Sequence, residues 1–258
     1  MLMGLEPAVA LLGVFVGLLV GSLGVGGGAI TTPTLILLGV APINAVGTDL
    51  LFVLPSKLFA TLLYHRRGEV DVTSIKKLLM GGIPAIILSY ILLVTYMRGV
   101  GIEGVNNAIR LLLGVLLIAV SFTHLAKIVL EKEAAKHHNL PPLSLELVGF
   151  IASALLFFTS VGSGVIVMAV LLHLFSSPPR KAVGTTLAYS LTVTSITTVF
   201  YAGLGAIDLR LTAILLLTGL PGIYLGFKAI KAVPRKPLIA MVAVSILLLG
   251  SSLLFLGG

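Results

Sequence analysis

The sequence predicts an all-α polytopic membrane protein, and three observations carry this prediction. The 258-residue chain is 58% hydrophobic and only 10% charged, whereas an ordinary soluble domain is about 25% charged. Its mean hydropathy is +1.18, and several apolar runs reach the roughly 20 residues that cross a bilayer. Short motifs recur in the same order in the two halves, which indicates an internal duplication.

The duplicated segments lie at a nearly fixed offset. Four short segments occur in the first half, in the order Gly24–Gly28, Ala45–Leu50, Tyr64–Asp71 and Gly82–Pro84. They recur in the second half in the same order, as Ser160–Gly164, Ala182–Leu187, Tyr201–Asp208 and Gly219–Pro221. Ala45 and Ala182 are 137 residues apart, and the later segments have the same offset. The offset of the first segment is one residue smaller. We therefore predict a first repeat over 1–126, a linker over 127–146 and a second repeat over 147–258.

Each repeat contains four hydrophobic segments, eight in all. They cover 8–39, 50–63, 78–96 and 111–125, and then 147–175, 187–202, 211–227 and 238–256. A glycine-rich turn interrupts the first segment of each repeat, at Gly24–Gly28 and at Ser160–Gly164. A helix over all of 8–39 would be about 48 Å long, against a hydrocarbon core of ~30 Å. We therefore predict a broken, re-entrant hairpin with arms over 8–22 and 29–38, followed by three crossings.

The basic residues favour this hairpin model. With a single helix over 8–39, alternate loops would carry 8 and 8 Lys and Arg, which gives no bias. With hairpins, only Arg98, Arg110 and Arg210 fall on one side, and thirteen fall on the other: Arg66, Arg67, Lys76, Lys77, Lys127, Lys132, Lys136, Arg180, Lys181, Lys228, Lys231, Arg235 and Lys236. The positive-inside rule places the thirteen in the cytoplasm. Three crossings per repeat then invert the second repeat and leave both termini outside. A long, kinked first helix is the alternative.

The two turns form the candidate binding site for an anion. The half-helices that follow them begin near Ala29 and Val165, and a helix N-terminus carries unpaired N–H groups and about half a positive charge. Two such ends converging near the bilayer midplane would bind an anion without a buried cation. The turn residues predicted to bind it are Gly24, Gly26, Gly27, Gly28, Ala29, Ser160, Gly162, Ser163 and Gly164. Close helix packing through small residues is the alternative explanation.

Polar residues next to the matching Gly47 and Gly184 are further candidates. Thr48 and Thr185 occupy equivalent positions, and Asp49 and Thr186 follow them. Their hydroxyls could contribute to the site, or the side chains could cap helices. An ionised Asp49 would repel an anion, so it could instead carry a coupling proton or Na⁺.

Lys57 lies within the apolar segment 50–63. A lysine at membrane depth is costly and therefore a functional candidate. It could contact the anion or relay a proton, or its ammonium could extend to the cytoplasmic face, since Arg66 and Arg67 follow.

The sequence also excludes several functions. It contains no cysteine, which rules out a disulfide or a thiol nucleophile, and it has no Walker motif, so ATP does not drive it within this chain. We expect no catalytic residue, no metal site and no cofactor. The net charge of +8 is explained by short basic loops beside the lipid bilayer rather than by a nucleic-acid partner.

With these motifs in place, the chain resembles the TauE/SafE family of sulfite and organosulfonate exporters. The residues that carry the resemblance are Gly21-x2-Gly24-Val25-Gly26-Gly27-Gly28-x4-Pro33, Ala45-Val46-Gly47-Thr48 and Tyr64-x-Arg66-x-Gly68-x-Val70-Asp71, together with their second copies. The resemblance covers essentially the whole chain. The chain departs from the family pattern at Asp49, where the family commonly has Ser, and at Lys57.

The resemblance implies transport of a small, sulfur-containing anion across the plasma membrane. Combined with the duplicated, broken helices, it predicts a secondary transporter that exports sulfite or an organosulfonate by alternating access, with a proton or Na⁺ as a coupling ion. A passive anion channel, or a permease for another sulfur-containing anion or a carboxylate, is the alternative.

Overall fold

The computed structural model describes residues 6–23, 28–129, 144–173, 175, 177–229 and 235–255, and these residues form only helices and their connections. The helices are α1 (Glu6–Leu23), α2 (Gly28–Leu37), α3 (Pro42–Arg66), α4 (Val72–Val129), α5 (Leu145–Thr159), α6 (Ser163–His173), α7 (Pro179–Gly203), α8 (Leu209–Ala229) and α9 (Arg235–Phe255). The predicted all-α class is confirmed. Residues 130–143 of the predicted linker lie outside the described residues.

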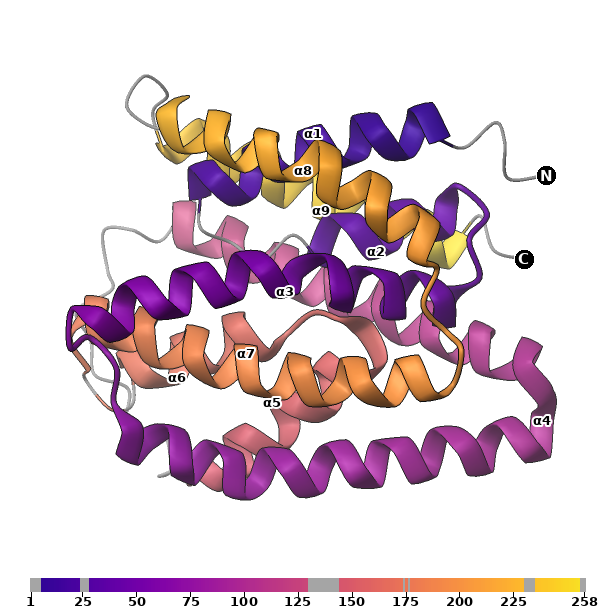
Figure 1. Cartoon of the computed structure of the whole chain (residues 1–258), viewed down its shortest axis with the longest axis horizontal. Helices are drawn as coiled ribbons and strands as arrows, with labels where there is room; N and C mark the ends of the chain where they lie inside the picture. The colour runs from indigo at the N-terminus through magenta and orange to yellow at the C-terminus, as the bar shows by residue number, and fades with distance from the viewer. Residues whose placement is uncertain are drawn as a thin grey trace. The chain divides into compact units, whose positions relative to one another are not determined.

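The helices form two compact units, and each unit takes segments from both halves of the sequence. Unit 1 comprises residues 1–52, 102–136 and 206–258, and unit 2 comprises residues 53–101 and 137–205. In unit 1, α1 packs along α8 (Figure 1), and α2 packs on α1 and α9. In unit 2, α5, α6 and α7 pack on one another. The halves are therefore interleaved in space, which their order along the chain does not reveal.

The helix boundaries repeat at the offset found in the sequence. Helices α3 and α7 each contain 25 residues, and they begin at Pro42 and Pro179, which are 137 positions apart. Proline suits the first helical position because the N–H that it lacks has no partner there. The next helices begin at Val72 and Leu209, again 137 positions apart. From the second motif onward, the two copies of each motif thus occupy equivalent positions along the chain relative to equivalent helices.

The first hydrophobic segment of each half is divided into two helices. Helix α1 ends at Leu23 and α2 begins at Gly28, and each packs on a different neighbour. Helix α5 ends at Thr159, and α6 begins at Ser163 after two residues with positive φ, Ser160 (φ 59) and Gly162 (φ 108). In the second half, this break excludes one continuous helix. In the first half, residues 24–27 lie outside the described residues, so the re-entrant hairpin there stays a prediction.

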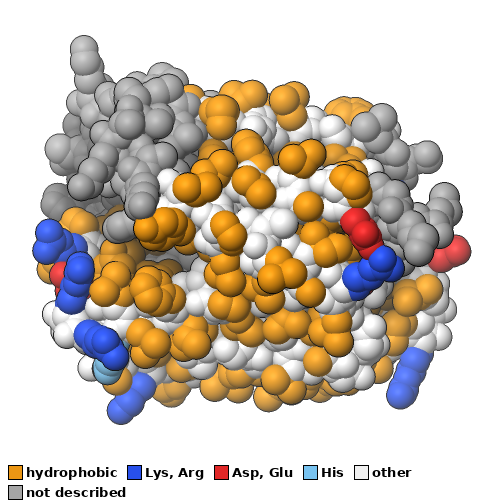
Figure 2. Space-filling view, turned by 45° about the horizontal axis from the view of Figure 1, so that its top comes forward, with side chains coloured by type: hydrophobic (Ala, Val, Ile, Leu, Met, Phe, Trp, Pro, Cys, Tyr) orange, Lys and Arg blue, Asp and Glu red, His pale blue; other side chains and the backbone are white. Residues whose placement is uncertain are grey.

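The helices long and apolar enough to cross a bilayer follow these broken segments. Among the described residues they lie in Pro42–Arg66, Val72–Phe122, Pro179–Gly203 and Leu209–Gly226. Gly101, with φ 75 and ψ 177, divides the 58-residue α4 into two helices. Large hydrophobic side chains such as Phe59, Leu217 and Val199 are more than 70% exposed, and Figure 2 shows hydrophobic side chains across the visible face, with charged ones at its margins. Such a surface is suited to lipid, and the chain is a multi-pass membrane protein.

Glycines bring the helices of each unit into close contact, and the two units use equivalent positions. In unit 1, a Cβ on Gly17 would overlap the Gly219 backbone, and a Cβ on Gly219 would meet the Phe52 ring. In unit 2, a Cβ on Gly82 would meet Ser153 and Tyr189. Gly82 and Tyr189 are the repeat mates of Gly219 and Phe52, and Ser153 matches Gly17 at the offset of the first segment. The packing of unit 1 therefore recurs in unit 2 with the two halves exchanged.

Candidate functional site

Two of the predicted turn residues in the first half lie at the start of α2. Gly28 and Ala29 are buried there, whereas Gly24, Gly26 and Gly27 lie outside the described residues. Four residues onward, the Thr32 hydroxyl donates a 3.0 Å hydrogen bond to Oδ2 of Asp49. Both residues are fully buried, so a carboxylate on α3 is connected to the half-helix that follows the first turn.

Thr48 and Thr185 connect the two halves of the sequence rather than capping their own helices. Helix α3 begins six residues before Thr48, and α7 six residues before Thr185. The Thr48 hydroxyl oxygen accepts the backbone N–H of Asp208 at 3.1 Å, and the Thr185 hydroxyl oxygen accepts that of Asp71 at 2.9 Å. Thr48 and Thr185 are repeat mates, and so are Asp71 and Asp208, so the two contacts are equivalent. Each threonine therefore fixes the start of a helix that belongs to the opposite half.

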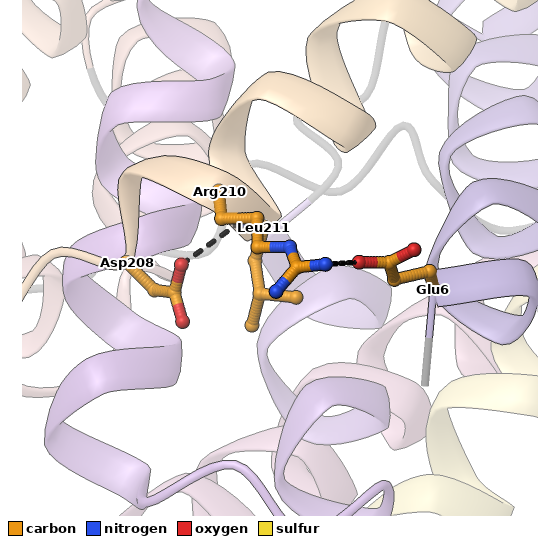
Figure 3. Close-up of polar contacts among 4 residues, drawn as sticks. All are labelled: Glu6, Asp208, Arg210 and Leu211. Carbon is orange, nitrogen blue, oxygen red and sulfur yellow. Dashed lines mark hydrogen bonds and ion pairs between the residues drawn. The ribbon is translucent and has the colours of Figure 1, made fainter. Parts of the chain in front are cut away.

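Asp71 and Asp208 cap the helices that these threonines hold. Asp71 accepts hydrogen bonds from the Thr73 N–H and the Ser74 hydroxyl, and Asp208 accepts one from the Leu211 N–H. Figure 3 shows Asp208 beside Arg210, whose guanidinium pairs with Glu6 at the start of α1. Both aspartates therefore cap the N-terminus of the helix that follows them.

The stability of unit 2 should depend on pH through Asp71. Partial burial raises the pKa of Asp71, but the hydrogen bonds from Ser74 and Thr73 outweigh burial and, with Lys181, hold the pKa below its ordinary value of 3.8. The folded state then binds a proton more weakly than the unfolded state, so the stabilisation is complete above pH 5 and is lost as the pH falls below 4. Asp71→Asn should melt about 2 °C below the unmodified protein at pH 7, and the difference should shrink in thermal melts as the pH falls below 4. A constant difference would contradict this role.

The second turn is fully described, and its residues are buried. Ser160 and Gly162 hold the backbone in positive-φ conformations, which favour glycine. Ser163, at the start of α6, shares a 3.0 Å hydrogen bond with Ser190 of α7. A Cβ on Gly164 would meet no atom of the described residues within 4 Å. Close helix packing, which explains Gly17 and Gly82, does not explain Gly164.

Helix α7 presents a row of hydroxyl side chains to this interior. Thr186, Ser190, Thr194 and Thr197 follow one another at helical spacing, and all are at most 6% exposed. Within the described part of the chain, the Thr186 hydroxyl is buried without a hydrogen-bond partner. A buried hydroxyl left unpaired costs about 1–3 kcal/mol, which is reasonable where a ligand or water completes its hydrogen bonding.

Lys57 joins this row. Its ammonium donates a 2.7 Å hydrogen bond to the hydroxyl of Thr194, which is fully buried. The ammonium therefore points to the protein interior rather than to a membrane surface. Lys57 and Thr194 are also repeat mates, because they are 137 positions apart.

The interior of unit 2 can thus offer an anion hydrogen-bond donors and a positive charge. The donors are the backbone N–H groups at the start of α6 and the hydroxyls of Ser163 and Thr186, and the charge is that of Lys57. Sequence reasoning identified these residues but missed Ser190, Thr194 and Thr32. Hydroxyl residues four apart in an otherwise apolar membrane segment were the signal that could have found Ser190 and Thr194.

Comparison with known proteins gives one family. The family model for the sulfite exporter TauE/SafE matches residues 9–253. A curated protein of Bacillus subtilis (strain 168), the "Probable membrane transporter protein YjnA", is 30% identical over 256 residues, which cover 97% of this chain and 100% of that protein. No solved structure matches the chain. The family comprises membrane transporters rather than enzymes, and the chain itself belongs to this TauE/SafE family.

Proposed function

We propose that this transporter exports a small sulfur-containing anion, sulfite or an organosulfonate, across the plasma membrane by alternating access. The observation that carries the proposal is the break before α6. There, Gly162 (φ 108) leads into a helix N-terminus, Gly164 leaves open space, and the buried Thr186 hydroxyl has no partner among the described residues. A helix N-terminus of this kind attracts anions through its N–H groups and its dipole.

The chemistry of the neighbouring side chains favours an oxyanion. Sulfite and sulfonate groups carry several oxygens that accept hydrogen bonds at once, and Ser163 and Thr186 can each donate one. Lys57 adds a positive charge within hydrogen-bonding distance of the same row, at Thr194. The description of the matching family as a sulfite exporter supports sulfur as the central atom. That the first turn converges on this site stays a prediction.

The membrane potential would drive export. Moving one negative charge outward is favoured by about 2.3 kcal/mol per 100 mV when the inside is negative. No hydrolytic or redox step is needed.

A flux assay tests the proposal. Purified protein in liposomes should show saturable sulfite efflux that sulfoacetate and taurine inhibit. Thr186→Val, which keeps the shape of the side chain but removes the hydroxyl, should raise the half-saturating sulfite concentration about tenfold, the effect of losing one hydrogen bond to a charged group. Thr61→Val on α3 is a matched control outside the row. If no sulfur oxyanion shows saturable flux, the proposal fails.

We also propose that the second repeat is inverted and that the basic loops lie in the cytoplasm. Support comes from ion pairs and a hydrogen bond near the helix ends, which join segments that the charge distribution places on the same side. In unit 2, Arg180 pairs with Glu69 at 3.7 Å, and Thr185 holds Asp71. In unit 1, Arg210 pairs with Glu6.

Single cysteines can test this orientation, since the chain contains no cysteine of its own. Cysteines introduced at Ser74 and Arg98 should react with a membrane-impermeant maleimide from opposite faces, with Ser74 labelled only after the cells are opened. Labelling of both from the same face would contradict the inverted arrangement.

A further inference from the structure

We propose that Tyr201 is a positioning residue for the anion site, because its hydroxyl holds open the break between α5 and α6. This inference rests on the proposed function, since the break supplies the anion with the N–H groups at the start of α6. Tyr201 lies on α7 and is 0% exposed. Its hydroxyl donates a 2.9 Å hydrogen bond to the carbonyl oxygen of Phe157 on α5, and both residues belong to unit 2.

The Phe157 carbonyl lies at the point where α5 stops. The N–H of Ser160 still donates to the Leu156 carbonyl at 2.8 Å, as in a regular helix. If the helix continued, the next such bond would join the N–H of Val161 to the Phe157 carbonyl, four residues earlier. Helix α5 ends at Thr159 instead, and this is the hydrogen bond that the Tyr201 hydroxyl replaces.

Two buried hydroxyls keep that carbonyl and that N–H apart. Tyr201 donates to the Phe157 carbonyl, and the Thr159 hydroxyl oxygen accepts the Val161 N–H at 3.1 Å. Thr159 is 0% exposed, and its hydroxyl lies 2.5 Å from the Leu155 carbonyl oxygen, to which it can donate. Unpaired backbone groups are costly at membrane depth. The two side chains therefore remove the cost of ending the helix here.

The position of the break decides which N–H groups are offered to the anion. The Ile166 N–H donates to the Gly162 carbonyl at 3.0 Å, which is the first hydrogen bond of α6. The N–H groups of Ser163, Gly164 and Val165 therefore precede the hydrogen-bond ladder of this helix, as at any helix N-terminus. A break that moved by one residue would change the direction of all three.

Removal of the Tyr201 hydroxyl should move the break without removing the packing. The Tyr201 ring contacts the Phe157 ring, with centroids 5.4 Å apart, and phenylalanine can make the same contact. The Phe157 carbonyl would then lack its donor, and the Val161 N–H is the donor that the helical pattern provides. Helix α5 would extend at the expense of the turn, and the start of α6 would no longer fit the anion.

The first half provides a matched control. Tyr64 on α3 is the repeat mate of Tyr201, and it is only half-buried. Leu23 occupies the position that matches Thr159 at the offset of the first segment, and leucine has no hydroxyl to accept an N–H. Tyr64→Phe removes the same atom as Tyr201→Phe, but outside the pair of hydroxyls that holds the second break.

The test uses the full chain and two measurements. In liposomes, Tyr201→Phe should raise the half-saturating sulfite concentration about tenfold, the effect of weakening one hydrogen bond to the anion, while the maximal flux stays within about threefold. In detergent, backbone amides of residues 160–166 should exchange with deuterium about fivefold faster, because the segment now samples two arrangements. Amides of α8, which belongs to the other unit, should exchange as before. Tyr64→Phe should change neither measurement.

Thr159→Val covers the case in which Tyr201→Phe does not fold. It should raise the half-saturating concentration in the same way, whereas Thr159→Ser, which keeps the hydroxyl, should stay within about twofold of normal. An unchanged half-saturating concentration in the folded variants, unchanged exchange over residues 160–166, or an equal effect of Tyr64→Phe would each overturn the inference and leave the anion-transport proposal intact. Faster exchange in Tyr201→Phe, combined with no saturable flux of any sulfur oxyanion in the unmodified protein, would instead defeat the proposed function.

Discussion

Gly149→Leu should prevent the correct packing of unit 2. A side chain at Gly149 of α5 would overlap the Leu78 carbonyl group of α4, and the Gly149 carbonyl oxygen also accepts the buried hydroxyl of Tyr189. Backbone atoms cannot rotate away as a side chain can, so α5 must move and break that hydrogen bond. Overpacking costs about 1–3 kcal/mol where side chains can adjust, and we expect at least about 3 kcal/mol here. Melting in detergent should fall by roughly 6–12 °C.

Gly99→Leu is the matched control for this prediction. Gly99 lies in α4, and a Cβ on it would meet nothing within 4 Å among the described residues. The same substitution there should leave the melting temperature within about 2 °C, the usual range for an exposed position. Equal melting temperatures for the two variants would show that α4 and α5 do not pack at this distance.

Lys57→Met should reduce sulfite transport about 100-fold. The ammonium of Lys57 is the positive charge that the structure places at the hydroxyl row, 2.7 Å from Thr194. Methionine keeps most of the length and apolar volume but cannot pair with an anion. A hydrogen bond to a charged group contributes about 1.5–3 kcal/mol, and the upper part of that range corresponds to a 100-fold loss. Sulfite flux in liposomes gives the measurement.

The charge of the substrate separates this role from a purely structural one. If Lys57 neutralises the anion, Lys57→Met should impair sulfoacetate far more than taurine, whose amino group already balances its sulfonate. Lys76→Met and Lys77→Met remove exposed charges near the start of α4 and should leave both fluxes near normal. An equal loss for sulfoacetate and taurine would indicate that Lys57 only supports the fold.

The helices and their breaks could be predicted from the sequence because they depend on local features. Long apolar runs, Pro42 and Pro179 at helix starts, and the positive-φ Gly162 each act within a few residues. The interleaving of the halves could not be predicted, because it depends on which surfaces fit together after the helices form. For the same reason, sequence reasoning placed Thr48 and Thr185 at a helix start or an anion site but could not find Asp208 and Asp71, their partners from the opposite half.

The direction of the Lys57 side chain could not be predicted from the sequence either. A lysine in a membrane helix can reach either the interface or the interior, and the choice depends on whether a buried acceptor is within reach. Thr194 supplies that acceptor from the equivalent position of the other half. Periodicity identifies the face of a helix on which a residue lies but not its partner on another helix.

The recurrence of one packing arrangement in both units makes the chain its own reference for substitutions. At equivalent positions, Phe52 meets Gly219, whereas Tyr189 meets Gly82 and shares its hydroxyl with Ser153 and the Gly149 carbonyl. The same shape is thus held by apolar contact in one unit and by hydrogen bonds in the other. Evolution after the duplication has already tested the Phe-for-Tyr replacement in this backbone setting. Replacing a residue by the one found at its repeat mate therefore introduces a side chain that already fits the equivalent position of the other unit. Such a substitution changes the chemistry of the helix contact while largely keeping its shape.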